Sequence, residues 1–163
     1  MPTAYEAADV KAEVAQLPAQ VSSADELMLR IVKLLHERML KYNWVGFYML
    51  ETTSPGQPPM LVLGHFEGAM TPHTRIHLHQ GICGAAASTG KTVVVDDVSQ
   101  DPRYLACSLE TKSEIVVPMF VHGKIVGELD IDSHFPAAFQ DVDRQLVEYC
   151  ANLVGDFLQK STQ

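Results

Sequence analysis

The chain has 163 residues, of which 47% are hydrophobic, and carries a formal net charge of −8. This length and apolar content predict one compact domain with its own core. The acidic balance argues against nucleic acid or an anionic membrane as a partner, because phosphate binding needs a basic stripe. No apolar run approaches the length of a transmembrane helix, and the N-terminus lacks a signal-peptide pattern, so we expect a cytoplasmic protein.

The first part of the chain predicts a lead-in segment followed by a helix. Residues 1–21 hold scattered apolar residues and form the expected lead-in, so that the domain itself is expected over residues 22–163. The stretch SSADE, which begins at Ser22, combines small oxygen donors with early acidic residues and is typical of a helix start. Apolar residues then recur at helical spacing to about Lys41.

Strands are expected next. Residues 43–50 and 60–66 flank a loop rich in Pro and Ser, which predicts a long-looped hairpin. Residues 73–79 alternate as HTRIHLH and predict a strand with its histidines on one face. A second hairpin is expected from residues 114–121 and 124–132, with its turn at His122-Gly123.

The second half also predicts a helix–turn–strand unit and a final helix. Gly90-Lys91-Thr92 resembles the end of a phosphate-binding loop, but the glycine spacing is wrong and the expected helix precedes the turn instead of following it. Gly90 is better explained as a helix C-terminal glycine ahead of the strand 93–95. An amphipathic helix is expected over residues 139–160. Helices flanking a mostly antiparallel sheet place the chain in the α+β class.

The three cysteines have different surroundings in the sequence. Cys150 lies on the apolar side of the last predicted helix, where core packing is expected. Cys83 opens a predicted helix, and a helix N-terminus would lower the pKa of its thiol. Cys107 lies in a polar loop that leaves it open to attack. Two buried structural thiols are the alternative for Cys83 and Cys107.

Acidic and aromatic side chains form a second candidate set. Asp130 and Asp132 are two residues apart on a predicted strand and share a face. They are either solvent contacts or, together with Glu114, the wall of a small cavity in which mutual repulsion raises one pKa. Trp44 and Tyr48 also share a strand face, either as core residues or as a flat wall for a methyl group.

The histidines raise a metal hypothesis. His73, His77 and His79 share the predicted strand face and Cys83 follows, and imidazole and thiolate both suit zinc. His73 and His79 are about 20 Å apart on an extended strand, too far to bind one ion. His77 and His79 with a cysteine could bind zinc, but a polar outer strand face explains them more simply, so no metal is expected.

Four stretches carry a family resemblance. They read, in chain order, NWVGFYML, GICGAAA, DPRYLACSLETKSEIVVPMF and GKIVGELDIDS. The chain resembles GAF domains, which have a PAS-like fold, and more narrowly the free methionine-(R)-sulfoxide reductases. The resemblance covers roughly residues 24–158.

The resemblance implies a mechanism and assigns residues to it. A nucleophilic cysteine, which matches Cys107, takes the sulfoxide oxygen as a sulfenic acid, and a second cysteine, which matches Cys83, resolves it to a disulfide. Thioredoxin would then reduce the disulfide, with no bound cofactor. The implied substrate-binding residues are Glu114, Asp130, Asp132, Trp44 and Tyr48.

The chain departs from the family at one position. Where the family typically carries a further cysteine, this chain has His73, a possible accessory residue. Either Cys83 resolves Cys107 directly, or an external thiol does, or the activity is lost. The alternative function is a non-catalytic GAF module that senses a small ligand, and a redox or metal sensor is a third. A homodimer is expected only by analogy with other GAF domains.

Overall fold

The computed structural model describes residues 4–52, 54–104 and 109–161. It contains one six-stranded sheet in the order β3-β2-β1-β6-β5-β4, in which all neighbours pair antiparallel. The strands are β1 (Trp44–Glu51), β2 (Met60–Glu67), β3 (Arg75–His77), β4 (Val93–Val95), β5 (Ser113–Val121) and β6 (Lys124–Ser133). The helices are α1 (Ala4–Gln16), α2 (Ala24–Arg38), α3 (Gly81–Thr89) and α4 (Asp141–Ser161), with short 3₁₀ turns η1 (Leu17–Ala19) and η2 (Val98–Gln100). The predicted α+β class is confirmed.

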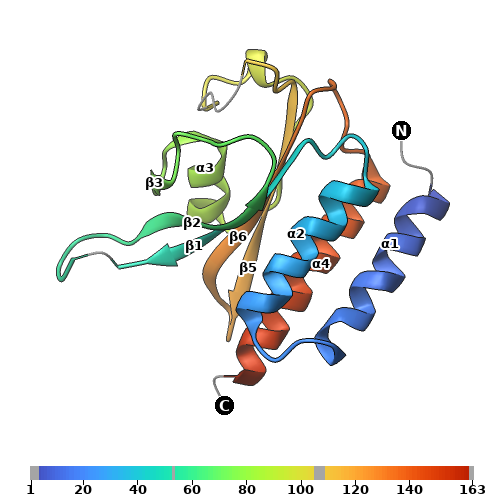
Figure 1. Ribbon diagram of the computed structural model, residues 1–163. Coiled ribbons are helices and arrows are strands. Elements are labelled where there is room, and N and C mark those ends of the chain that lie inside the picture. Colours follow the sequence, from blue (N-terminus) through green and yellow to red (C-terminus); the bar gives the residue numbers. More distant parts are fainter. Residues whose placement is uncertain (1–3, 53, 105–108, 162–163) are drawn as a thin grey trace.

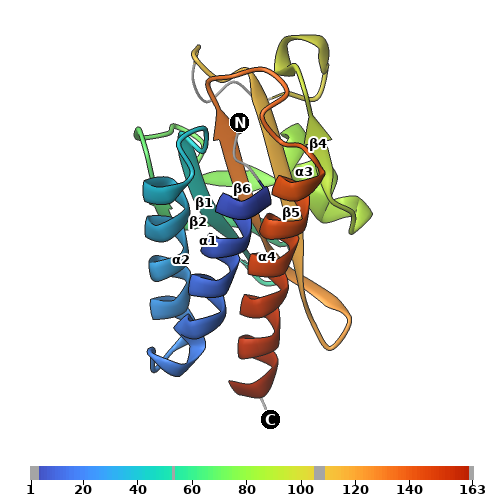
Figure 2. The ribbon, with the colours of Figure 1, turned by 90° about the vertical axis from the view of Figure 1, so that its right-hand side faces the viewer.

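The sheet separates two hydrophobic clusters. Helices α1, α2 and α4 cover one face and α3 lies on the other (Figure 1). In the view turned by 90°, α1 lies in front of the sheet between α2 and α4 (Figure 2), in contact with both. The main core fills the space under these three helices, and a smaller cluster lies between the sheet and α3. The segment expected as a lead-in is helical in α1 and places Ala7, Val10 and Val14 in the main core.

The helix boundaries follow the local signals in the sequence. Ser23 caps α2 by accepting a hydrogen bond from the backbone N–H of Glu26 at 3.1 Å, which satisfies a donor that the helix itself leaves free. Gly90 ends α3 with φ 71° and a hydrogen bond from its N–H to the carbonyl of Ala86. Strand β4 follows this turn, so no helix begins at Lys91 and a phosphate-binding loop is excluded.

Both predicted hairpins are confirmed, with an irregularity in the first. The register of β1 against β2 shifts between Gly46 and Tyr48, where β2 holds one residue more than β1. The turn between β5 and β6 has φ 50° at His122 and 76° at Gly123, the left-handed pair of a tight hairpin turn.

The strand predicted over residues 73–79 is shorter than expected. Only Arg75–His77 pairs with β2, and His79 has φ 74°, which takes the chain out of the strand. The expected strand face of three histidines is therefore wrong. Among the described helices, none combines the length and apolar character that a membrane crossing requires.

Gly155 allows α4 to approach β5 closely. A Cβ at this position would lie 2.6 Å from the backbone oxygen of Phe120. In an open helix, Gly→Ala would stabilise by about 1 kcal/mol, but this contact reverses the sign. We expect Gly155→Ala to lower the free energy of unfolding in urea by about 1–3 kcal/mol. Asn152→Ala, at an exposed position of α4, should change it by no more than about 0.5 kcal/mol. A stabilised Gly155→Ala protein would contradict the proposed close packing.

Candidate functional site

The sheet face under α3 carries a row of carboxylates. Asp130 pairs with Gly46 on β1 and with Val116 on β5, and Asp132 pairs with Trp44 and with Glu114. Since side chains alternate along a strand, Asp130, Asp132 and Glu114 share this face, as predicted. Glu128 belongs to the same row.

All four carboxylates are buried. Their exposed fractions are 5% for Glu114, 0% for Glu128, 2% for Asp130 and 3% for Asp132, which rules out the solvent-contact interpretation. Several of their oxygens lack a hydrogen-bond partner among the described residues: both of Glu128, Oδ1 of Asp130 and Oδ1 of Asp132. Buried polar atoms are normally paired, so this row is short of donors and suited to receive a cation or an ammonium group.

Burial and mutual repulsion hold protons on this cluster. Burial raises the pKa of each of the four carboxyl groups above its ordinary value. The charge of Asp130 raises the pKa of Glu114, Glu128 and Asp132 further. These carboxyls therefore hold their protons to higher pH than exposed carboxyls do, which is the direction that the sequence led us to expect.

Cys83 lies in the first turn of α3 directly against this row. Its side chain is buried, and its thiol donates a hydrogen bond to Oδ2 of Asp130 at 3.4 Å. Burial, then the charges of Asp130 and Glu128, raise the pKa of the thiol well above its usual value. The expectation that the helix N-terminus lowers this pKa is wrong, because desolvation and repulsion outweigh a helix dipole worth about 0.3–1 kcal/mol.

Two aromatic rings from β1 border the carboxylates. The indole of Trp44 lies over Gly46, where a Cβ would come within 2.3 Å of the ring, and its N–H donates to the carbonyl of Ala69 at 3.0 Å. The hydroxyl of Tyr48 donates to the carbonyl of His73 at 2.7 Å. The centroids of the two rings are 6.3 Å apart. The space that Gly46 leaves is therefore filled by the indole, which forms a flat wall beside Asp132.

A small cavity reaches Cys83 and the carboxylates. Its volume is about 10 Å³, roughly the space that one water molecule needs. Its lining residues are Tyr48, Ile76, Gln80, Gly81, Ile82, Cys83, Glu114 and Asp130. The structure thus brings together five residues that the sequence selected: Tyr48, Trp44, Glu114, Asp130 and Asp132, with Cys83 beside them.

The remaining candidates stand apart from this cluster. Cys107 lies outside the described residues, so its place relative to Cys83 stays a prediction. His73 is half-buried, and its backbone carbonyl holds Tyr48. Cys150 packs in the main core, as predicted. Glu128 is a residue of this site that was not predicted from the sequence, although its strand parity with Asp130 is the signal that marks it.

One group of described side chains could hold a metal ion. Ligand atoms of Cys83, Glu114 and Asp130 all lie within 4.8 Å of one another. Neither His77 nor His79 belongs to it, and both are exposed, so the zinc site that the sequence offered as an alternative is not formed by the described residues.

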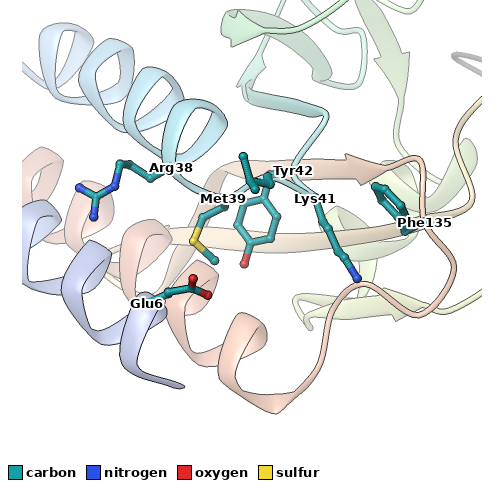
Figure 3. Close-up of a pocket in the computed structure, with 7 residues that line it drawn as sticks. Glu6, Arg38, Met39, Lys41, Tyr42 and Phe135 are labelled. Atoms are coloured by element: carbon teal, nitrogen blue, oxygen red, sulfur yellow. The ribbon is translucent and has the colours of Figure 1, made fainter. Parts of the chain in front are cut away.

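A larger groove lies elsewhere. It has a volume of about 310 Å³ and borders the end of α2 (Figure 3). Its polar side chains already have partners: Arg38 pairs with Glu13, Tyr42 donates to Asp143, and Lys41 lies over the ring of Phe135. Among the described residues that line it, none is a thiol or an unpaired carboxylate, so the smaller cavity is the better candidate for chemistry.

The buried carboxylates make stability depend on pH. A carboxyl with a raised pKa binds its proton more tightly in the folded state, so its stabilising contribution is full below the unfolded pKa of about 4 and is lost as pH rises through the raised value. Each such group lowers the free energy of unfolding by up to about 1.4 kcal/mol per pH unit in that window.

We expect Asp132→Asn to remove the contribution of one carboxyl to this pH dependence. The free energy of unfolding of the variant should therefore rise relative to that of the wild type as pH rises. Urea titrations at several pH values would measure it. The exposed control Asp156→Asn should run parallel to the wild type, and a parallel Asp132→Asn curve would contradict the raised pKa.

Comparisons with known proteins identify the family of the chain. The family model described as GAF domain matches residues 23–157, which confirms the GAF fold. The free methionine-R-sulfoxide reductase of Saccharomyces cerevisiae is 38% identical over 135 residues, covering 82% of this chain and 71% of the relative.

Two solved structures are similar over most of the chain. The free methionine-R-sulfoxide reductase of Neisseria meningitidis, determined in complex with its substrate, aligns with a TM-score of 0.88 at 32% identity and covers 98% of this chain and 93% of its own. The type II free methionine-R-sulfoxide reductase of Thermoplasma acidophilum aligns with a TM-score of 0.77 at 38% identity, covering 84% and 93% respectively. The chain therefore belongs to the GAF-domain family and, within it, to the free methionine-R-sulfoxide reductases.

Proposed function

We propose that this protein reduces free L-methionine (R)-sulfoxide to methionine by thiol chemistry at the cavity under α3. The observation that carries the proposal is the meeting of Cys83 with a buried, donor-poor row of carboxylates beside two aromatic rings. Family membership supports the same substrate, since the related structures are named for this activity.

The carboxylates select a free amino acid. The unpaired Oδ1 atoms of Asp130 and Asp132 accept hydrogen bonds from the substrate ammonium group, which supplies the donors that the described residues do not. A peptide-bound or acylated residue carries no such charge and leaves these buried oxygens unsatisfied. The site thereby discriminates through the cost of an unpaired buried group.

The remaining groups act on the sulfoxide. Trp44 and Tyr48 offer the flat apolar wall for the methyl group, and Glu114, whose pKa is raised by burial and by Asp130, donates a proton toward the sulfoxide oxygen. The sulfur of Cys107 attacks the sulfoxide sulfur, and the oxygen passes to Cys107 as a sulfenic acid while methionine leaves as the thioether.

Cys83 completes the cycle in this proposal. It attacks the sulfenic acid to form a Cys83–Cys107 disulfide, and thioredoxin returns both thiols. His73 stands at the position where the family resemblance implies another cysteine, so in this proposal Cys83 and Cys107 alone carry out the turnover. We assign Cys83 this role because it is the thiol that lines the cavity among the described residues.

Substrate entry requires the cavity to widen. A volume of about 10 Å³ admits one water and no amino acid. Four of the lining residues lie close together in the sequence: Ile76 in β3, Gln80 in the connection, and Gly81 and Ile82 at the start of α3. His79 and Gly81 in this stretch both have positive φ. We expect displacement of residues 76–82 to open the site.

A coupled assay with thioredoxin, its reductase and NADPH tests the proposal. We expect turnover with the (R) sulfoxide of free methionine and none with the (S) epimer. Cys107→Ser should abolish it, and Cys83→Ser should stop recycling by thioredoxin while one equivalent of methionine is still released. Cys150→Ala, which removes a core thiol remote from the cavity, is the matched control and should keep full activity. Full turnover by Cys107→Ser, or none by the wild type with thioredoxin or a small dithiol, would sink the proposal in favour of a ligand-sensing role.

The ammonium contact gives a separate test. We expect N-acetylmethionine (R)-sulfoxide to lose at least about 10²-fold in kcat/KM, because it leaves the carboxylates unpaired. Asp132→Asn should raise KM for the free amino acid by about 10- to 10²-fold, because one charge-assisted hydrogen bond is lost. The same change should reduce the ratio of kcat/KM between the free and the acetylated substrate. Equal kcat/KM for both substrates in the wild type would show that these carboxylates do not bind the amino group.

A further inference from the structure

Glu128 is a member of the buried row to which neither the ammonium site nor the aromatic wall gives a task. It lies on β6 between Tyr48 of β1 and Pro118 of β5, one alternation beyond Asp130. Its side chain is 0% exposed, and neither of its oxygens has a hydrogen-bond partner within the described part of the chain. A carboxylate without a partner is among the costliest groups to bury, and an apolar side chain would be more stable here.

The group beside Glu128 is the thiol of Cys83. Each lies close enough to alter the ionisation of the other. Asp130 already accepts the thiol hydrogen bond at 3.4 Å. The sulfur of Cys83 therefore has two carboxylates of β6 beside it, one engaged with the thiol and one with both oxygens unoccupied.

We infer that Glu128 is the base that takes the proton from Cys83 when this thiol forms its disulfide. The inference rests on the proposed function, in which Cys83 attacks the sulfenic acid of Cys107. Asp130 orients the thiol, and Glu128 receives its proton.

The step balances without an added oxidant, because the sulfoxide has already oxidised Cys107. The thiol proton moves from Cys83 to the Glu128 carboxylate as an S–S bond forms. The S–O bond of the sulfenic acid breaks, and the departing hydroxide takes up one proton and leaves as water. The proton that Glu128 gains equals the one that the hydroxide needs, so the net products are a disulfide and water.

The environment suits Glu128 to this task. An ordinary carboxylate is too weak a base for a thiol, whereas a base whose pKa approaches the working pH transfers protons best. Burial and the charge of Asp130 raise the pKa of Glu128 in that direction. The titratable groups that face this pair are Asp130 and Asp132 of β6, Glu114 of β5 and Tyr48 of β1.

Single-turnover kinetics on the full chain separate this step from the first one. Fully reduced protein, freed of reductant, is mixed with one equivalent of methionine (R)-sulfoxide. Methionine release is followed by chromatography, and the sulfenic acid and the disulfide by dimedone trapping and peptide mass spectrometry. We expect Glu128→Gln to release methionine at the wild-type rate and to form the disulfide on the order of 10²-fold more slowly. Glu128→Leu, which removes both oxygens, should show the same split, whereas the exposed control Glu51→Gln should match the wild type in both steps.

Two further readouts exclude a merely structural role. Disulfide formation by the wild type should slow as pH falls and Glu128 becomes protonated, and the Gln variant should lose that dependence. In a Cys83→Ser background, Glu128→Gln should not change the lifetime of the sulfenic acid. The inference is overturned if Glu128→Gln forms the disulfide at the wild-type rate, or if methionine release slows by the same factor. A wild type that releases no methionine would remove the proposed function and this inference together.

Discussion

The burial of acidic side chains on one face of a twisted sheet is the constraint on which this site depends. Three of these carboxylates come from β6, a central strand, and one from β5, so strand pairing sets their positions. Helix α3 covers them and adds a thiol where apolar side chains would pack better. Burying the carboxylates is unfavourable in free energy, and this penalty falls on the smaller cluster. The main core under α1, α2 and α4 supplies the stability of the fold.

The geometry of the site follows from strand pairing more than from loops. The registers of β1, β6 and β5 set Trp44, Asp132 and Glu114 side by side on three neighbouring strands. Gly46 has no side chain, so the indole of Trp44 can lie flat across the sheet at this point. The register shift between Gly46 and Tyr48 changes which residues of β2 pair with β1 on either side of it. Side chains held on central strands keep their positions when a ligand enters, which suits a site that must recognise a small and flexible amino acid.

Much of this arrangement could be predicted from sequence alone, because it depends on local rules. Alternation placed Asp130 and Asp132 on one face, and the caps at Ser23 and Gly90 set the helix boundaries. What could not be predicted depends on which face of the sheet a helix covers. Without that, the helix N-terminus alone suggests a lowered pKa for the Cys83 thiol, and strand alternation does not show whether Asp130 and Asp132 are buried or face solvent. The strand predicted over residues 73–79 was too long, because the sequence HTRIHLH alternates even where the backbone turns at His79.

Two opposing influences on the Cys83 thiol fit the resolving role that we propose for it. Its position in the first turn of α3 favours the thiolate, but burial and the carboxylates beside it favour the thiol, and their effect is the larger. A thiolate would react with any oxidant that reached it. A buried thiol held by Asp130 reacts only when an electrophilic sulfur arrives and a base stands ready for the proton. In the proposed mechanism, the acidic row thus serves two purposes: it binds the substrate amino group, and it keeps the second cysteine unreactive until the first has been oxidised.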